Sequence, residues 1–422
     1  RNEGKLQFLR DEAALPDVRE SSGHAAAADF DGDGDVDLFV AGRLVPGRYP
    51  DAPQSRLYRN DGGRFVDATQ ELAPMLAQAG MVTSALWTDV DADGFVDLLL
   101  GAHWQPIRLL RNDGGRRFVD ATADAGLAAH TGWWNSLCAI DADGDGDLDY
   151  VAGNQGRNSK YKADAQHPAR LYFGDFDDNG QRDLVEAKYE GDSLLPVRGR
   201  SCSSQAMPFL AEKFKTYDQF ASALLSDIYT APKLQQSGQL AATTLASVLL
   251  RNDGLGRFAI EELPHRAQIA PIFGMVAIGD LLVCAQNSFA PEPETGRHDG
   301  GTGLVLRAAA NGFVVVPPHE HGLCAFGDHK ALVARQVGNE LELLFARNDG
   351  PLHAAKLAGA RALALPVGAR GVVEYADHRR AFEVHAGSGY LSQLPPLLGQ
   401  GALRVRWRLG RGDERVLELA PR

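Results

Sequence analysis

Four short segments of the chain repeat one acidic pattern: DFDGDGDVD from Asp29, DVDADGFVD from Asp89, DADGDGDLD from Asp141 and DFDDNGQRD from Asp175. Each has oxygen-bearing side chains at positions 1, 3, 5 and 9 and glycine at position 6. This spacing is typical of a calcium loop, because Ca²⁺ prefers about six to eight oxygen ligands and a tight turn lets one segment supply most of them. For a single copy, an ordinary Asp/Gly turn without metal is the alternative. Four copies favour the metal, because carboxylates this closely spaced repel one another without a cation.

The predicted ligands are the side chains at positions 1, 3, 5 and 9 and the backbone carbonyl at position 7. The side-chain ligands are Asp29, Asp31, Asp33 and Asp37; Asp89, Asp91, Asp93 and Asp97; Asp141, Asp143, Asp145 and Asp149; and Asp175, Asp177, Asn179 and Asp183. The carbonyl ligands belong to Asp35, Phe95, Asp147 and Gln181. The neutral Asn179 predicts that the fourth loop binds most weakly. The expected cofactor is therefore about four Ca²⁺ ions in a structural role, since each loop can saturate its ion with its own oxygens.

Residues after the loops exclude two other classes of calcium-binding protein. An EF-hand needs a bidentate Glu at position 12, where three of the four loops have Val40, Leu100 and Ala152. The loops lead into apolar runs such as DLFVAG and DLLLGA, which are short and indicate buried strands. Helices, which follow the loops of EF-hands and dockerins, are not expected there.

A second repeat lies between the acidic loops: LYRNDGGRFVDAT from Leu57, LLRNDGGRRFVDAT from Leu109 and LLRNDGLGRFAIEE from Leu249. Each reads as a strand, an Asn-Asp-Gly turn and a second strand, because Asn, Asp and Gly tolerate the positive φ that tight hairpins require. Weaker copies begin at Leu304 and Leu343. A full unit of four strands that recurs along the chain predicts an all-β fold of the β-propeller type.

Six blades fit this pattern, and seven or eight would be possible if residues upstream were removed. The predicted blades are residues 24–68, 82–121, 133–168, 169–262, 272–317 and 325–357. We expect RNEGKLQFLRD, at the start of the chain, to supply the outermost strand of the last blade.

A helical insertion is predicted at about 205–231. Its apolar residues recur at spacings of three and four, and Thr216 with Gln219 predicts a capping box. The stripe consists of Leu210, Phe214, Tyr217, Ala221, Leu224 and Ile228. Packing on the propeller rim and a mobile lid are the two interpretations of this segment.

Composition places limits on function. The 422 residues carry a formal net charge of −12, which argues against a nucleic-acid partner. No apolar run is long enough to span a membrane. The cysteines are scattered, which argues against a zinc site. Buried free thiols are expected, and two disulfides are the alternative that an even count permits. The cysteines are Cys138, Cys202, Cys284 and Cys324.

The loops with DLFVAG or DLLLGA, together with the LYRNDGGRFVDAT hairpins, resemble FG-GAP/VCBS repeats of integrin α-subunit propellers and their bacterial relatives, over residues 1–357. Within residues 369–422, AGSGYLSQ and VRW resemble the ASPIC/UnbV domain. The combination is similar to bacterial cartilage acidic protein-like proteins. The resemblance implies an extracellular, cell-surface or periplasmic protein that functions in adhesion or recognition, with no agreed enzymatic reaction.

The sequence thus predicts an exported calcium-binding scaffold whose face loops bind a protein or glycan, with no catalytic residue assigned. An enzyme with a central pocket and a purely structural spacer remain as alternatives. Three further motifs have simple structural explanations. Arg411-Gly412-Asp413 fits a turn between strands, His319 and His321 fit a solvated loop, and Trp133 and Trp134 fit core packing better than sugar stacking.

Overall fold

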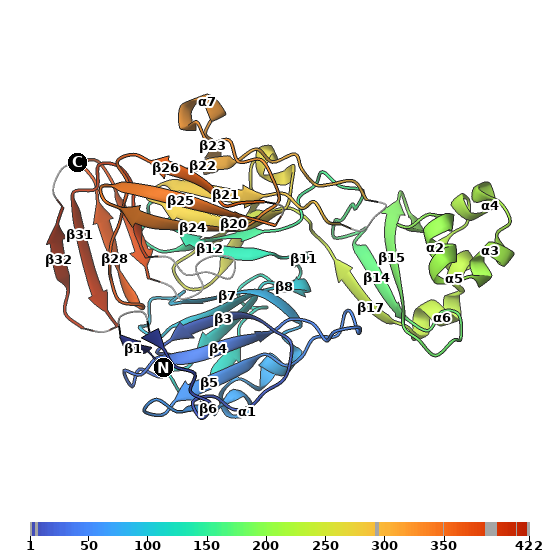
Figure 1. Cartoon of the computed structure of the whole chain (residues 1–422), viewed down its shortest axis with the longest axis horizontal. Coiled ribbons are helices and arrows are strands. Elements are labelled where there is room, and N and C mark those ends of the chain that lie inside the picture. Colours follow the sequence, from blue (N-terminus) through green and yellow to red (C-terminus); the bar gives the residue numbers. More distant parts are fainter. Residues whose placement is uncertain are drawn as a thin grey trace.

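The computed structural model describes residues 2–4, 7–291, 295–348, 350–384, 395–410 and 412–419. Small antiparallel sheets make up most of the regular secondary structure, and the helices are short (Figure 1). The predicted all-β, propeller-like fold is confirmed. In the described part of the chain, no helix combines the length and the apolar character needed to cross a membrane.

The first two blades follow the predicted strand order. Blade 1 consists of β3 (Ser22–Ala28), β4 (Asp37–Gly42), β5 (Arg56–Asn60) and β6 (Phe65–Asp67). Blade 2 consists of β7 (Met81–Thr88), β8 (Asp97–Pro106), β9 (Arg108–Asn112) and β10 (Phe118–Asp120), with β11 (Thr131–Trp133) added beside β8. Between them lie α1 (Thr69–Leu72) and η1 (Pro74–Gln78). The Asn-Asp-Gly hairpin turns are confirmed, since Gly62 and Gly114 have φ of 65° and 64°, a region that favours glycine.

Blade 3 corrects the predicted boundaries. It consists of β12 (Ser136–Ile140), β13 (Asp149–Gly153), β18 (Val248–Asn252) and β19 (Phe258–Glu262), followed by η2 (His265–Gln268). Its outer strand β18 pairs with β13, Val151 opposite Leu249, although residues 154–247 separate the two strands. Residues 133–168 and 169–262 are therefore not two successive blades.

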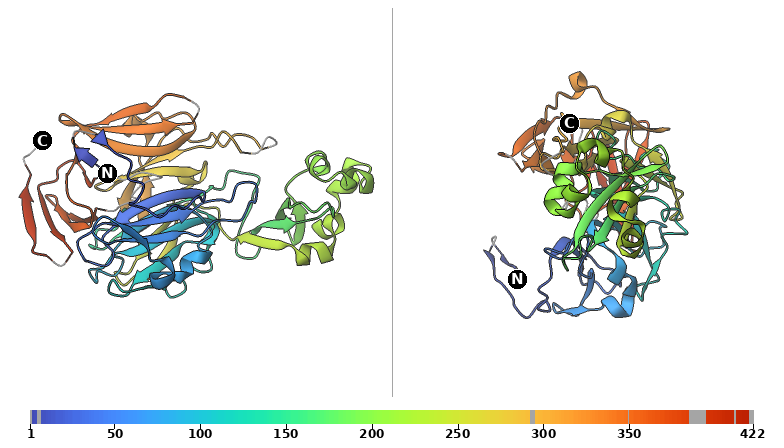
Figure 2. Two further views of the ribbon diagram at one scale, coloured as in Figure 1. Left: turned by 60° about the horizontal axis from the view of Figure 1, so that its bottom comes forward. Right: turned by 90° about the vertical axis from the view of Figure 1, so that its right-hand side faces the viewer.

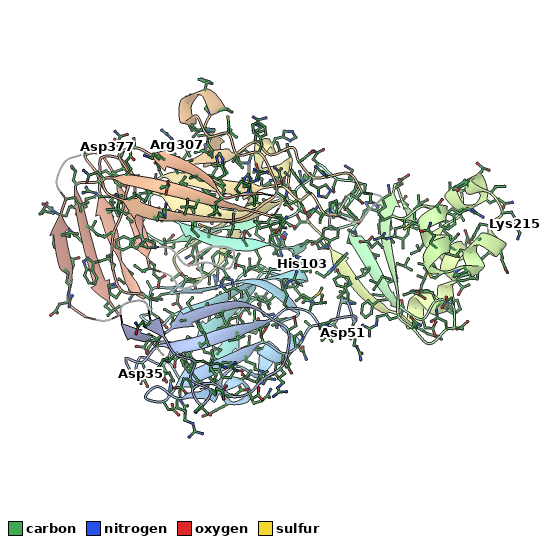
Figure 3. The ribbon with its side chains drawn as sticks, viewed as in Figure 1. Asp35, Asp51, His103, Lys215, Arg307 and Asp377 are labelled. Atoms are coloured by element: carbon green, nitrogen blue, oxygen red, sulfur yellow. The ribbon has the colours of Figure 1, made fainter. Side chains whose placement is uncertain are left out.

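Residues 154–247 form an inserted module. Its sheet consists of β14 (Ala169–Gly174), β15 (Asp183–Glu190), β16 (Ser193–Pro196) and β17 (Gly238–Ala242), in the order β16-β15-β14-β17. Its helices are α2 (Arg200–Ala206), α3 (Phe209–Lys213), α4 (Tyr217–Ala221), α5 (Leu225–Tyr229) and α6 (Ala231–Gln236). The module projects from one side of the blades, and its helices, marked by Lys215, lie farthest away (Figures 1, 2 and 3).

The predicted capping box is confirmed, because Thr216 Oγ1 accepts from the Gln219 N–H and the Gln219 side chain accepts from the Thr216 N–H. The predicted apolar stripe is only partly buried. Leu210 and Ile228 are buried, but 66% of Tyr217 and 43% of Leu224 are exposed. The reason is that the chain turns between five short helices, so that residues three or four apart do not share one helix face.

Blades 4 and 5 lack acidic loops. Blade 4 consists of β20 (Ile272–Ile278), β21 (Leu281–Gln286), β22 (Leu304–Ala309) and β23 (Gly312–Val315). Blade 5 consists of β24 (His329–Val337), β25 (Glu340–Arg347) and β26 (His353–Leu357), and α7 (Pro318–His321) precedes it. The first residues of the chain form a separate hairpin, in which β1 (Asn2–Gly4) pairs with β2 (Gln7–Phe8). The expectation that they complete the last blade is therefore wrong for the strands described.

The described residues thus form five blades rather than the six predicted, because the unit with the fourth loop is an insertion. The innermost strands pack in the order β3, β7, β12, β20 and β24. Apolar side chains fill the space between neighbouring blades. Between blades 1 and 2, Phe30 stacks on Trp87 at 5.9 Å between ring centroids and meets the edge of Phe118 at 5.7 Å. Burial of each such side chain contributes about 1.5–3 kcal/mol to the stability of the fold.

A second cluster fixes the inserted module to the blades. Trp104, Tyr161 and Leu171 are buried in it, and Trp104 Nε1 donates to the Tyr49 hydroxyl at 2.6 Å. Trp133 lies between Trp104 and Tyr161, with ring centroids at 5.0 and 4.9 Å. These contacts hold the module's sheet against the blades. The helices pack on that sheet, since Leu210 and Ile228 share a buried cluster with Tyr172 and Val185, so the interpretation that the helical stripe packs on the propeller rim is wrong (Figure 1).

The C-terminal sheet consists of β28 (Ala369–Glu374), β29 (Arg379–Glu383), β31 (Arg404–Leu409) and β32 (Arg415–Glu418), in the order β29-β28-β31-β32. The short strands β27 (Arg361–Ala362) and β30 (Leu397–Leu398) pair beside it. Figure 1 shows this sheet at the opposite end of the blades from the inserted module. The AGSGYLSQ segment and Arg411 lie outside the described residues.

The four cysteines are free, as predicted, but only Cys138 and Cys284 are buried. Cys202 is half-buried in the inserted module and Cys324 is exposed.

Candidate metal centre

Each acidic loop connects two adjacent antiparallel strands. Loops 1, 2 and 3 (residues 29–37, 89–97 and 141–149) join the first two strands of blades 1, 2 and 3, and loop 4 (residues 175–183) joins β14 to β15. In Figure 3, Asp35 of loop 1 lies at the end of the blades near the C-terminal sheet, and His103 lies at the other end, towards the inserted module.

In each loop, three carboxylates bring one oxygen apiece to within 4.8 Å of one another. The sets are Asp29, Asp31 and Asp33; Asp89, Asp91 and Asp97; Asp141, Asp143 and Asp145; and Asp175, Asp177 and Asp183. The other predicted carboxylate ligands, Asp37, Asp93 and Asp149, do not belong to these sets. Among the described residues, no other three His, Cys, Asp or Glu side chains come together in this way, and His319 and His321 belong to none of the four sets.

The glycine at position 6 lets the loop close on itself. Gly34 and Gly94 have φ of 96° and 101°, which a side chain rarely tolerates. Their N–H groups donate to the position-1 carboxylates Asp29 and Asp89, each at 3.0 Å. The chain therefore curls around a point that the carboxylates face.

The aspartates at position 9 in loops 1 to 3 are fully buried anchors. Asp97 accepts the Val90 N–H at 3.1 Å and the Asn112 N–H at 2.8 Å. Asp37 and Asp149 each accept two equivalent N–H groups. Burial outweighs these bonds and raises the pKa of Asp97 to about 7, and those of Asp37 and Asp149 to about 6. A cation beside them would offset the free-energy cost of burying their charge.

Asparagines of the Asn-Asp-Gly turns connect neighbouring loops. These contacts were not predicted from the sequence. Asn112 Nδ2 of blade 2 donates to the Phe30 carbonyl of loop 1 at 2.8 Å. Asn252 Nδ2 of blade 3 donates to the Val90 carbonyl of loop 2 at 2.9 Å. The available signal was the repetition of Arg-Asn-Asp-Gly in full, since a tight turn alone does not require the same asparagine each time.

The arginines of the same repeat approach position 3 of the loops. Arg111 forms an ion pair with Asp91, and Arg251 forms one with Asp143. Arg59 of blade 1 pairs instead with Asp61 at 2.8 Å.

The donor set fits a hard cation such as Ca²⁺. It consists of carboxylate oxygens from one turn, and some of them have no protein partner. Asp91 Oδ1 in loop 2 and Asp177 Oδ1 in loop 4 are buried without a hydrogen bond. A buried carboxylate oxygen without a partner is costly, and a metal ion would satisfy it.

These features define a propeller-type scaffold built from repeated acidic loops. Residues 29–100 and 89–152 match the FG-GAP-like repeat family, so that the matched part runs from loop 1 to the second strand of blade 3. No curated protein sequence matches the chain.

Proposed function

We propose that the protein is an exported calcium-binding recognition scaffold. Four loops would each hold one Ca²⁺ with the side chains at positions 1, 3, 5 and 9 and the carbonyl at position 7. The observation that supports this most strongly is the convergence of three carboxylates in each loop, including buried oxygens without partners. When bound, the ions would neutralise the loops and stiffen the blades.

Calcium titration of the whole chain tests the metal part of the proposal. We expect about four Ca²⁺ per chain, with dissociation constants of about 10⁻⁴ to 10⁻³ M, as in extracellular modules. At calcium concentrations 10 to 100 times the Kd, each site would stabilise the fold by about 1.4–2.7 kcal/mol. The melting temperature should therefore rise when calcium is added and fall back when a chelator removes it. Mg²⁺ should raise the melting temperature less, because it dehydrates reluctantly. An unchanged melting temperature and no bound calcium at about 10 mM would contradict it.

Recognition is the less direct part of the proposal. It is supported by two clefts between the loops and the C-terminal sheet. One, of about 730 Å³, is lined by residues that include Asp89, Arg370 and Trp407. The other, of about 770 Å³, is lined by residues that include Phe95 and Leu409. These volumes fall in the range of ligand sites, and an aromatic ring among arginines suits a glycan or an extended peptide.

Screening glycan and peptide arrays in calcium buffer tests recognition. We expect a ligand whose binding is lost in Trp407→Ala and retained in Leu352→Ala, because Leu352 is exposed and lines neither cleft. Binding of no member of either array would favour the structural spacer instead.

We also propose that the C-terminal sheet is an ASPIC/UnbV-like domain. The VRW segment that carries this resemblance lies in β31, where Val405 is buried in the core of the sheet. An extracellular, cell-surface or periplasmic location follows from the same resemblance and suits weak sites, because calcium is millimolar outside cells.

A further inference from the structure

The C-terminal sheet contacts the first carboxylate of loop 3. The Ala381 N–H of β29 donates to Asp141 Oδ2 at 2.7 Å. Arg380 Nη1 donates to the Asp141 carbonyl at 3.0 Å and lies 3.6 Å from Asp141 Oδ1. Asp141 is buried, and its Oδ1 also accepts the Gly144 N–H of its own loop at 2.7 Å. A side chain at Gly144 would come within 3.1 Å of the Arg380 guanidinium, so the two surfaces fit closely.

The same sheet contacts loop 2. Arg370 of β28 forms an ion pair with Asp89, the first carboxylate of this loop. Glu383 of β29 accepts the Thr88 hydroxyl at 2.9 Å and the Asp89 N–H at 3.3 Å. Thr88 in turn contacts the Tyr150 hydroxyl of blade 3 at 2.8 Å. The C-terminal sheet therefore contacts loop 2 where blades 2 and 3 meet.

In loops 1 and 4, the carboxylate at position 1 is held by its own loop. The hydrogen bonds of Asp29 come from Gly32 and Gly34 of its own loop. Those of the Asp175 side chain come from Asn179 and Gly180 of its own loop. Loop 4 lies in the inserted module, which is at the opposite end of the blades (Figure 1).

The carboxylates of loops 2 and 3 outnumber the arginines that pair with them. Loop 2 carries four carboxylates against the guanidinium groups of Arg111 and Arg370, and loop 3 carries five against those of Arg251 and Arg380. Two or three negative charges remain in each loop, and one divalent cation neutralises most or all of them. The arginines thus do not replace the cation.

We propose that loops 2 and 3 are metal sites completed by the C-terminal sheet, and that metal binding there and docking of this sheet stabilise each other. This inference rests on the proposed calcium binding. Ala381 and Arg380 orient Asp141, as hydrogen bonds to a metal ligand do in other sites. Conversely, a bound ion fixes the loop backbone whose Asp141 carbonyl and Asp89 N–H hold the sheet. Such coupling is reciprocal in free energy.

A matched pair of loop variants tests the coupling in the whole chain. Asp145→Asn removes the position-5 ligand of loop 3 and Asp33→Asn removes that of loop 1; in the described residues neither contacts the C-terminal sheet through a hydrogen bond or ion pair. Calcium titration should show that each variant loses about one strong site. Hydrogen exchange of residues 379–384 in calcium should become faster in Asp145→Asn and stay unchanged in Asp33→Asn.

The reciprocal test uses the arginines of β29. Arg380→Ala should weaken one calcium site about tenfold, while Arg379→Ala, whose side chain is exposed, should leave all sites unchanged. Unchanged exchange of residues 379–384 in both loop variants, or tighter calcium binding in Arg380→Ala, would overturn the coupling while calcium binding itself stands. A wild-type chain that binds no calcium would instead overturn the proposed function.

Discussion

Loops 1 to 3 and loop 4 have the same nine-residue spacing but different surroundings. In the blades, each position-9 aspartate accepts two N–H groups, one from its own loop and one from an Asn-Asp-Gly turn. In the inserted module, Asp183 accepts the Phe176 N–H at 2.9 Å, and no Asn-Asp-Gly hairpin follows β15. The nine-residue motif therefore specifies the conformation of the loop. The hydrogen bond from the neighbouring Asn-Asp-Gly hairpin determines how strongly the loop is held in the fold.

The largest expected effect of a single substitution separates these two classes of loop. Asp97→Ala would leave the buried Val90 and Asn112 N–H groups without partners, at about 1–3 kcal/mol each, and we expect a loss of about 2–6 kcal/mol in the free energy of unfolding. Asp183→Ala frees one half-buried N–H group and should cost about 1 kcal/mol. Urea unfolding in a chelator measures both without the contribution of calcium. Equal losses would contradict the comparison.

Asparagine variants measure how much the hydrogen bonds between blades contribute to stability. Asn112 Nδ2 bonds to loop 1 and to its own loop, whereas the half-buried Asn60 bonds through Nδ2 to the Val36 carbonyl of its own blade. We therefore expect Asn112→Ala to lower the free energy of unfolding by about 1–3 kcal/mol and Asn60→Ala by less. Should both variants unfold at the same urea concentration, the contact between blades would have no energetic importance.

The pH dependence of calcium binding should also differ between the loops. Carboxylates must be deprotonated to bind metal, and burial raises the pKa of Asp97 to about 7 and of Asp149 to about 6. In loop 4, hydrogen bonds from Gly180 and Asn179 lower the pKa of Asp175, while burial raises that of Asp183. As pH falls from 7.5 to 5.5, the blade sites should weaken by up to about tenfold per pH unit for each proton bound, and loop 4 should weaken less.

In the metal-free protein, the buried aspartates should make the fold less stable as pH rises. An aspartate whose pKa is raised on folding stabilises the fold below its unfolded pKa, and this contribution is lost as pH rises through about 6 to 7. Calcium should reverse that loss. Calorimetric titrations and thermal scans at pH 5.5, 6.5 and 7.5 would measure both trends. An affinity that does not change with pH in the blade loops would contradict the assignment of their buried carboxylates to the metal sites.

The smallest effect is expected at Asp178, which lies inside loop 4 but off the ligand positions. Its side chain is 82% exposed and pairs with Lys233 at 2.8 Å. Its φ of 60° suits Asn as well as Asp, so Asn is a better replacement than Ala. Asp178→Asn should change the free energy of unfolding by less than about 0.5 kcal/mol and keep the calcium stoichiometry. The loss of an ion would show that the ligand positions are misassigned.

Local features of the fold were predictable from the sequence, and distant pairings were not. The spacing of aspartates and glycine predicted the loops, and Thr216 with Gln219 predicted a helix cap, because these patterns depend on neighbours within a few residues. The pairing of β13 with β18 was not predictable from spacing, since residues 154–247 intervene and the complete strand-loop-strand unit inside them resembles another blade. The contacts of Arg370 and Arg380 with the loops were not predictable either, because both residues lie more than two hundred positions from their aspartates and nothing local marks them.

Anomalous scattering from crystals grown in millimolar calcium would show whether the acidic loops hold calcium ions. We expect four peaks, one inside each carboxylate set, with the peak at loop 4 the weakest because Asn179 replaces an aspartate. A map with no peak at loops 1 to 3 would contradict the proposed calcium binding.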